Sequence, residues 1–443
     1  MPSQTEPAAN WPPSRTAWYT VVVLMVAYLF SYVDRQILSM LVGPIKADLG
    51  LTDTEVSLLH GLAFAVCYTL LGVWPIGRWA DTGNRRNLIA GGVALWSLMT
   101  ALCGKAVSYG GLFLARIGVG VGEAALTPSA YSMIADYFPP AKRGRALGLF
   151  AMGVYFGIGA AIMITGYVVQ LVATQPTTML PVFGEVRSWQ VAFLLLGPPG
   201  LLVALWIMTI KEPPRQGLAS AGADFTDTLN HIFDTRHMGF YLGLTAGIAL
   251  LTLLFNAVAF WTPAHLMRIH HFTPAAVAGS YGPIMFIFGA LGILSGGALA
   301  DFWRKQGRLD AELRVAYCSA LLLWPVAWFC FKVEDSGTML TLLAPLLFLS
   351  SFPFGAASSA IQHVTPNQFR ARTSALYLLV INLTGIGFGA TAASLISDYW
   401  LHDPQRIGDG VAAVAIVAAP LAAACLFSAA RSFRAMQNTS RTL

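Results

Sequence analysis

The sequence predicts an all-α integral membrane protein. Hydrophobic residues make up 56% of the 443 residues and charged residues only 11%, whereas soluble domains carry roughly 25% charged residues. Mean hydropathy is +0.63. Apolar runs of about 20 residues, long enough to cross roughly 30 Å of hydrocarbon as helices, recur along the whole chain. This pattern excludes a membrane barrel, whose strands alternate over about ten residues.

Twelve apolar runs are present, and we expect each to form one membrane-spanning helix. In chain order they cover approximately residues 17–41, 54–76, 87–107, 110–137, 144–172, 189–210, 238–266, 274–300, 312–332, 338–363, 373–398 and 410–430.

A polar segment over residues 211–237 divides the twelve runs into six and six. Pro213, Pro214 and Gly217 end the sixth helix, and "DFTDTLNHIF" is typical of a short amphipathic helix on the inner membrane surface. The predicted organisation is a tail (1–16), a six-helix bundle (17–210), this linker (211–237), a second six-helix bundle (238–430) and a second tail (431–443).

The two halves share short motifs. "GRWADTGNRR" follows the second run, and "GALADFWRKQGR" follows the eighth about 220 residues later. "PAKRGRALGL" follows the fourth run, and "PNQFRARTSAL" follows the tenth at an offset of about 227. Two matches at nearly one offset predict a duplicated unit, with a pseudo-two-fold axis along the membrane normal. Chance similarity of short basic loops is the alternative.

The placement of Lys and Arg predicts the orientation. With the N-terminus inside, nineteen of the 27 basic residues lie in inner segments and six in outer ones, which is the bias that retains basic segments in the cytoplasm. We therefore expect a multi-pass protein of the cell membrane with both termini cytoplasmic. The same bias explains the pI of about 9.1 without nucleic acid as a partner.

Three stretches resemble the major facilitator superfamily, and within it the spinster subfamily. They are "GRWADTGNRR", "SYVDRQ" and "ARIGVGVGEAALTPSAYSMIADYFP". The first departs from the superfamily's signature, with Thr82 where a basic residue is usual and Asn84 where Gly is usual. The resemblance implies a carrier that alternates between outward and inward openings, here a bacterial homologue. Animal spinster proteins are associated with lysophospholipid or sphingolipid-type substrates.

The resemblance also implies a conformational switch at the loops that follow the second and eighth helices. Asp81 resembles the residue that caps its helix and pairs across the contact between the halves, where it would hold the cytoplasmic side shut. The predicted switch residues are Gly77, Asp81, Arg85, Arg86, Arg145 and Asp301.

Charged residues lie deep inside the first and fourth runs, although a charge at the membrane centre costs about 2.5–3.5 kcal/mol. We predict that Asp34 and Glu123 carry protons and that Arg35 or Arg116 binds an anionic group. His60, at a similar depth, is either a participant or a hydrogen-bonded packing residue. The alternative is that Asp34 with Arg35, or Arg116 with Glu123, form static ion pairs that fix helix packing.

The second half carries no Asp, Glu, Lys or Arg deep within its helices. It offers polar candidates, Asn256, Gln362, His363 and Asn382, beside the aromatic residues Phe255, Phe260, Trp261, Phe286, Phe352 and Phe354. Charges on one wall and aromatic rings on the other would suit an amphiphile with an anionic head. The aromatic residues would equally suit contact with lipid.

The sequence thus predicts a proton-coupled secondary transporter for an amphipathic or lipid-like anion, with substrate-binding residues Arg35, Arg116, His60, Phe255, Asn256 and Asn382. An exporter of small organic anions or drugs is the alternative. A lipid-modifying membrane enzyme is disfavoured, since no nucleophile with a base at usable spacing is present. Five cysteines without pair spacing indicate no metal site, and we expect a monomer without cofactors.

Overall fold

The computed structural model describes residues 11–73, 75–172, 177–180, 184–215, 225–354, 356, 360–361 and 364–442. It is almost entirely helical, as predicted. The elements of the first half are α1 (Ser14–Leu49), α2 (Asp53–His60), α3 (Leu62–Val73), α4 (Pro75–Thr82), α5 (Arg85–Cys103), α6 (Tyr109–Glu123), α7 (Leu126–Tyr137), α8 (Pro140–Val172), β1 (Thr177–Leu180), β2 (Gly184–Arg187), α9 (Ser188–Leu196) and α10 (Pro199–Ile207).

The second half begins after α11 (Phe225–Phe233), a short helix in the segment between the halves. Its elements are α12 (Met238–Arg268), α13 (Pro274–Lys305), α14 (Ala311–Lys332), α15 (Ser336–Ser351), α17 (Asn367–Leu395), the π-helical turn η1 (Ile396–Trp400), the 3₁₀ turn η2 (Pro404–Arg406) and α18 (Ile407–Thr442).

Eleven of the described segments are long and apolar enough to cross a membrane. Three of them join two helices end to end, namely α2 with α3, α6 with α7, and α9 with α10. The shorter apolar helix α15 stands where the tenth spanning helix was predicted. The antiparallel hairpin β1–β2, which precedes the sixth span, was not predicted from the sequence.

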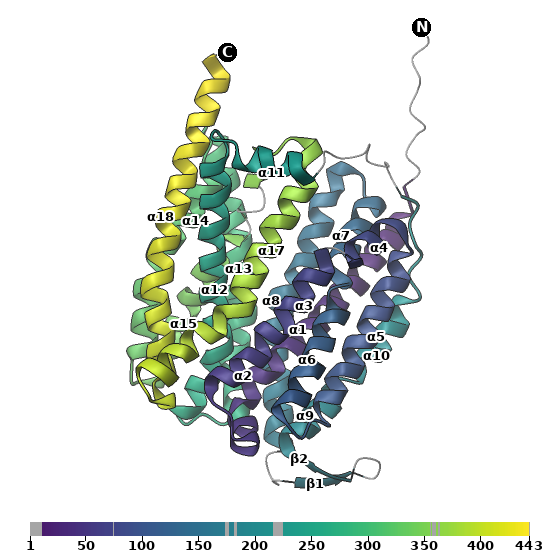
Figure 1. Ribbon diagram of the computed structural model, residues 1–443, viewed down its shortest axis with the longest axis vertical. Coiled ribbons are helices and arrows are strands. Elements are labelled where there is room, and N and C mark those ends of the chain that lie inside the picture. Colours follow the sequence, from purple (N-terminus) through teal and green to yellow (C-terminus); the bar gives the residue numbers. More distant parts are fainter. Residues whose placement is uncertain are drawn as a thin grey trace.

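The two halves stand side by side, with both chain ends at one face of the molecule (Figure 1). We call this the termini face; α4, α7 and α11 lie near it. The opposite face carries the β1–β2 hairpin, α2 and α9, and we call it the hairpin face (Figure 1). The most extensive packing between the described parts of the two halves joins α8 with α13, α1 with α12, and α17 with both α2 and α3.

Glycines allow α8 and α13 to approach closely. A Cβ atom added to Gly159 would lie 2.6 Å from Cβ and 2.9 Å from the backbone nitrogen of Phe286. One added to Gly166 would lie 2.6 Å from the carbonyl oxygen of Pro274. Because real side chains do not fit at such distances, this seam depends on residues without a Cβ. The tight seam sets the relative position of the two walls that enclose the candidate site.

Candidate functional site

A cavity of about 250 Å³ lies between the halves. Helices α1, α2, α3 and α8 line one side, and α12, α13 and α17 line the other. Its polar and aromatic lining residues are Tyr32, Arg35, Gln36, His60, Phe64, Tyr155, Thr252, Phe255, Asn256, Phe354, Tyr377 and Asn382. Most of the remaining lining is aliphatic, so the cavity is apolar with a few polar groups, as ligand sites usually are.

Arg35 is the charged group on the cavity wall, and it pairs with Glu123 of α6. Its Nε and Nη2 atoms each lie 2.6 Å from Oε2 of Glu123. The Ser31 hydroxyl, one turn earlier on α1, donates to the same oxygen at 2.6 Å. Oε1 of Glu123 is buried and has no hydrogen-bond partner among the described residues. One carboxylate oxygen therefore neutralises the cavity cation while the other remains unpaired.

Three aromatic rings surround the same guanidinium. The Arg35 Cζ atom lies 4.5 Å from the ring centre of Phe64 and 4.8 Å from those of Tyr32 and Tyr68. Cation–π contacts of this kind contribute about 0.5–2 kcal/mol each, and more when desolvated. The rings and Glu123 together hold a desolvated cation at the edge of an apolar space.

Asp34 and Arg116 lie behind the cavity wall. They are 3% and 0% exposed, and neither is among the described residues that line the cavity. Nη1 of Arg116 donates to the backbone oxygen of Asp34 at 3.0 Å, and its Nη2 has no partner in the described part of the chain. Of the five predicted polar residues, Arg35 and His60 face the cavity, whereas Asp34, Arg116 and Glu123 are buried beside it.

His60 ends α2 beside the α1 backbone. Its Nδ1 lies 3.2 Å from the carbonyl oxygen of Arg35, and its ring lies 4.2 Å, centre to centre, from Phe260 of the other half. Both roles considered from the sequence fit this position, because the ring packs across the halves and also lines the cavity.

The second half supplies an apolar and aromatic wall. Phe255, Asn256 and Asn382 all line the cavity, as predicted. Asn256 donates to the Thr252 carbonyl one turn earlier on its own helix, at 2.8 Å. Phe255 packs edge-on against Tyr155 of α8. Gln362 and His363 lie outside the described residues.

A second cavity, of about 480 Å³, lies toward the termini face. Tyr68 and Thr69 of α3, residues of α4 and α7, and residues 374–382 of α17 line it. Leu378 and Asn382 line both cavities, so these spaces share a wall. Tyr68 belongs to the ring set around Arg35 and also to this second lining.

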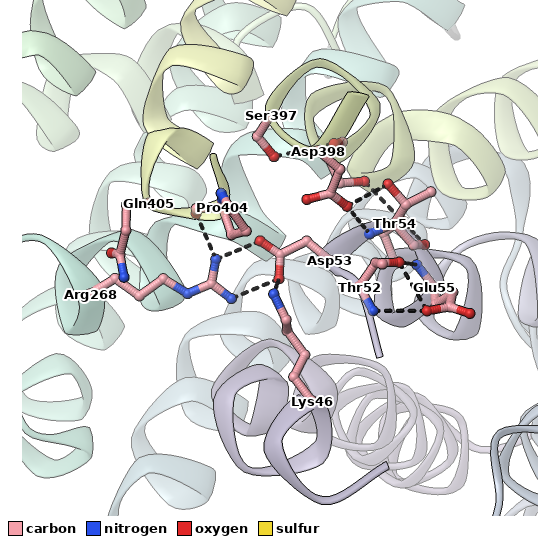
Figure 2. A network of polar contacts seen from close by, with 12 residues as sticks. Lys46, Thr52, Asp53, Thr54, Glu55, Arg268, Ser397, Asp398, Pro404 and Gln405 are labelled. Carbon is pink, nitrogen blue, oxygen red and sulfur yellow. Dashed lines mark hydrogen bonds and ion pairs between the residues drawn. The ribbon is translucent and has the colours of Figure 1, made fainter. Parts of the chain in front are cut away.

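The hairpin face is closed by polar contacts between the halves (Figure 2). Asp53 at the start of α2 is fully buried and binds Arg268 of α12 through both carboxylate oxygens, at 2.5 and 2.8 Å. Lys46 of α1 binds the same carboxylate at 2.5 Å. Asp398 of η1 accepts hydrogen bonds from the backbone nitrogen and the hydroxyl of Thr54, at 2.8 and 2.7 Å. The second half thereby caps a helix of the first, where the helix dipole favours an anion.

The sequence analysis missed this network. "LTDTEV" carries the capping-box spacing that begins a helix, with Thr52 and Glu55 three residues apart, and the structure forms that box. The signal locates the start of α2, but it does not reveal that Asp53 faces Arg268 across the halves. Arg268 was counted only among the outer basic residues.

The predicted switch residues lie toward the termini face, and the described contacts of Arg85 and Arg86 stay within the first half and the start of the linker. Arg85 is buried and binds Glu212 at 2.7 Å, Asp136 of α7, and the Pro213 carbonyl at 3.1 Å. The Arg86 guanidinium binds Asn87, and its backbone nitrogen binds Glu212. Gly77 lines the second cavity, and Arg145 and Asp301 are exposed. The side chain of Asp81 lies outside the described residues.

Comparisons with known proteins identify the family. The chain is 28% identical over 424 residues to an "MFS-type efflux pump" of Mycolicibacterium smegmatis, covering 95% of this chain and 94% of that protein. It is 26% identical over 402 residues to "Protein spinster homolog 1" of Xenopus tropicalis, covering 85% and 72%.

The fold matches a solved structure described as a bacterial homologue of the human lysosomal transporter Spinster, inward-facing and unoccupied. The TM-score is 0.80 at 24% identity, covering 96% of this chain and 99% of that one. The model of the Major Facilitator Superfamily matches residues 24–390. The chain is therefore a spinster-like, multi-pass membrane transporter that belongs to the Major Facilitator Superfamily.

Proposed function

We propose that the protein is a proton-coupled secondary transporter that moves an amphipathic or lipid-like anion by alternating access. The observation that carries the proposal is the position of Arg35: it lines an apolar cavity between the halves and is neutralised there by buried Glu123. Binding and release of an anion require a cation that faces the ligand cavity and whose counter-ion can be replaced by the substrate.

Coupling follows from competition for one guanidinium. A proton on Glu123 removes the charge that neutralises Arg35, so the guanidinium is then available to a substrate anion. Loss of the proton restores the pair and displaces the anion. Asp34 is the second proton-carrying candidate, since the charges of Glu123 and Arg116 both act on it. In this proposal Arg116, held on the α1 backbone, positions Asp34 and contacts no substrate.

The chemistry of the lining supports an amphiphile. The anionic head would take Arg35, with His60 and Asn382 beside it, and the apolar part would lie against the wall that contains Phe255 and Tyr377. A cavity of about 250 Å³ admits a head group and a short chain; a longer chain would extend along the shared wall into the second cavity.

The proposed orientation follows the distribution of basic residues. The termini face would be cytoplasmic and the hairpin face outside, in the cell membrane of a bacterium, with a single chain as the working unit. The contacts of Asp53 and Asp398 then close the outer side, and the second cavity lies on the inner side. Gly77, Asp81, Arg85, Arg86, Arg145 and Asp301 would form the inner contacts of the opposite, outward-open state.

The test uses purified protein in lipid vesicles that contain a pH-sensitive dye. An anionic single-chain lysolipid is added outside, and proton movement and substrate uptake are recorded separately for the wild type and for Glu123→Gln. The amide keeps the shape and one acceptor but binds no proton. We expect exchange of substrate for substrate to continue while substrate-driven proton movement is lost. Glu55→Gln, at the half-buried carboxyl that completes the capping box of α2, is the matched control, because glutamine also fits that box.

Proton movement that remains at the wild-type rate in Glu123→Gln would remove Glu123 from the coupling mechanism. Proton movement by the wild type when no substrate has been added would contradict coupling to substrate altogether.

Export of small organic anions or drugs is the second candidate. The similarity to a protein named as an efflux pump favours it, and Arg35 would bind a compact carboxylate equally well. Gluconate, which has a carboxylate and no apolar chain, discriminates the two in the same vesicles. Faster uptake of gluconate than of the lysolipid would favour this second candidate.

A further inference from the structure

His265, near the hairpin end of α12, is a buried imidazole without a hydrogen-bond partner. It is 5% exposed, and neither Nδ1 nor Nε2 bonds to any described residue. The backbone of Gly408 leaves room for the ring, because a Cβ atom there would overlap it. Phe331 and His270 pack edge-on against it, at 5.4 and 5.5 Å between ring centres. Burial without a hydrogen-bond partner is unfavourable for a polar ring, so the closed form is destabilised at this position.

The imidazole lies one helical turn before Arg268, which binds Asp53 of the other half. Asp409 of α18 acts electrostatically on His265, and it is already bound by Lys332 at 2.6 Å and by Arg406 at 2.7 Å. The charged and titratable groups that act on the ring are Arg268 of α12, His270 of the following loop and Asp409 of α18. His271, Glu334 and Asp335 adjoin His270, and Lys332 of α14 and Arg406 of η2 bind Asp409.

We propose that His265 is a proton-binding site that senses the pH at the hairpin face and releases the contact between Arg268 and Asp53 when it becomes charged. An imidazolium at this position would adjoin Arg268 while Asp409 is occupied by two other cations. Its charge would be desolvated and repelled in the closed form. Opening of the hairpin face hydrates the ring and separates it from these cations.

The sign of the pH effect follows from linkage. The closed form holds the imidazole neutral, and the open form lets it bind a proton, so protons favour the open form. Burial also lowers the pKa of His270, so this ring is neutral near pH 7 in the closed form. When the pH falls, His270 becomes a second positive charge. Stability of the closed form is therefore complete above the pKa of a free histidine and decreases as the pH falls below it. If only the open form binds the proton, the ratio of the open population to the closed population changes by up to about tenfold per pH unit.

The inference rests on alternating access as proposed above, because it requires the hairpin face to open. It adds a proton site that is separate from the Arg35–Glu123 pair. An acidic exterior would open the carrier to the side from which protons are taken up.

The experiment measures a distance across the hairpin face and requires no substrate. Cysteines replace Val107 of the first half and Trp400 of the second, which are 85% and 81% exposed, with the five native cysteines changed to alanine. Nitroxide labels on the pair report the distance by pulsed electron resonance in lipid nanodiscs between pH 7.5 and pH 5.5. We expect the longer-distance population to increase at least severalfold on acidification in the wild type and to stay constant in His265→Gln.

Control variants separate the possible causes. His271→Gln, at an exposed histidine of the same loop, should keep the wild-type response. Asp53→Asn should separate the labels already at pH 7.5, which establishes that the pair reports opening and that the variants are folded.

Three results would overturn the proposal. An unchanged acid response in His265→Gln would assign the proton elsewhere. A wild-type distance that is independent of pH, beside a separated Asp53→Asn, would reject the sensor and leave alternating access intact. Labels that stay together in every variant would contradict alternating access itself, and the sensor with it.

Discussion

Gly61 of the first half lies against the backbone of Gly387 in the second. A Cβ atom added to Gly61 would overlap the carbonyl oxygen of Gly387 and would lie 2.8 Å from that of Ile386. Both neighbours are main-chain atoms, which cannot rotate away as a side chain can. The backbone at the junction between α2 and α3 therefore packs directly against the backbone of α17. The closed hairpin face depends on this contact.

Gly61→Ala is expected to favour the open hairpin face. Overpacking at a tight contact costs typically about 1–3 kcal/mol, and here only the closed form contains that contact. The label pair at positions 107 and 400 should show a larger long-distance population at neutral pH. Gly43→Ala is the matched control, because nothing lies within 4 Å of a Cβ atom at Gly43. Equal distance distributions in the two variants would mean that α17 adjusts to the methyl group.

Asp53→Asn should destabilise the closed form of the hairpin face more than Glu55→Gln, which lies in the same first turn of α2. It leaves Lys46 and Arg268 facing each other without their carboxylate, and removal of one partner from a buried pair costs about 3–5 kcal/mol. Proteoliposomes should show a reduced rate of substrate exchange, since one of the two end states becomes less populated. Glu55→Gln serves as the control. Normal exchange in Asp53→Asn would indicate that Asp398 and Thr54 suffice to close this face.

The Arg35–Glu123 pair should behave as a coupled unit in a double-mutant cycle. Arg35→Met alone leaves a buried carboxylate and Glu123→Leu alone leaves a buried guanidinium, so each should lower stability by about 3–5 kcal/mol. The double variant contains neither charge and should be more stable than either single variant, although inactive. Thermal unfolding in detergent measures the three differences. Additive losses would show that the two residues do not stabilise each other.

Arg85 is expected to stabilise the start of the linker. Its guanidinium reaches Glu212, Ser132 and the Pro213 carbonyl at once, and a lysine ammonium has no planar fork to do so. Arg85→Lys should therefore lower the unfolding temperature and accelerate protease cleavage between residues 211 and 237. Arg86→Lys is the control, because its guanidinium binds the neighbouring Asn87 and reaches the Met208 and Ile210 carbonyls only at 3.5 and 3.4 Å. Identical cleavage rates for both variants would contradict this role.

The residues of α1 illustrate how far sequence reasoning extends. The sequence grouped Asp34 and Arg35 as residues that could face one cavity, but adjacent helical residues point about 100° apart, and only Arg35 lines the cavity while Asp34 lies behind it. The static pairs considered from the sequence were Asp34 with Arg35 and Arg116 with Glu123. The structure instead pairs Glu123 with Arg35.

The hairpin face illustrates what local signals omit. The capping box fixes the first turn of α2, since Thr52 and Glu55 satisfy each other's backbone donors. Arg268 lies 215 residues from Asp53, and no spacing rule relates residues so far apart in the chain. In the sequence, His265 is one of several histidines near a helix end. Its lack of hydrogen-bond partners among the described residues depends on Gly408, Phe331 and Asp409 from two other helices.

The sequence by itself determined the membrane-spanning helices and the depth of the intramembrane charges, because both follow from hydrophobicity and a fixed rise of 1.5 Å per residue. Only the tertiary structure decided that Glu123 neutralises Arg35, that Asp53 joins the halves through Arg268, and that His265 is left unpaired. Hydrogen bonds and ion pairs act over about 3 Å, so they depend on the rotation of each helix about its axis and on close contacts such as that of Gly61 with Gly387.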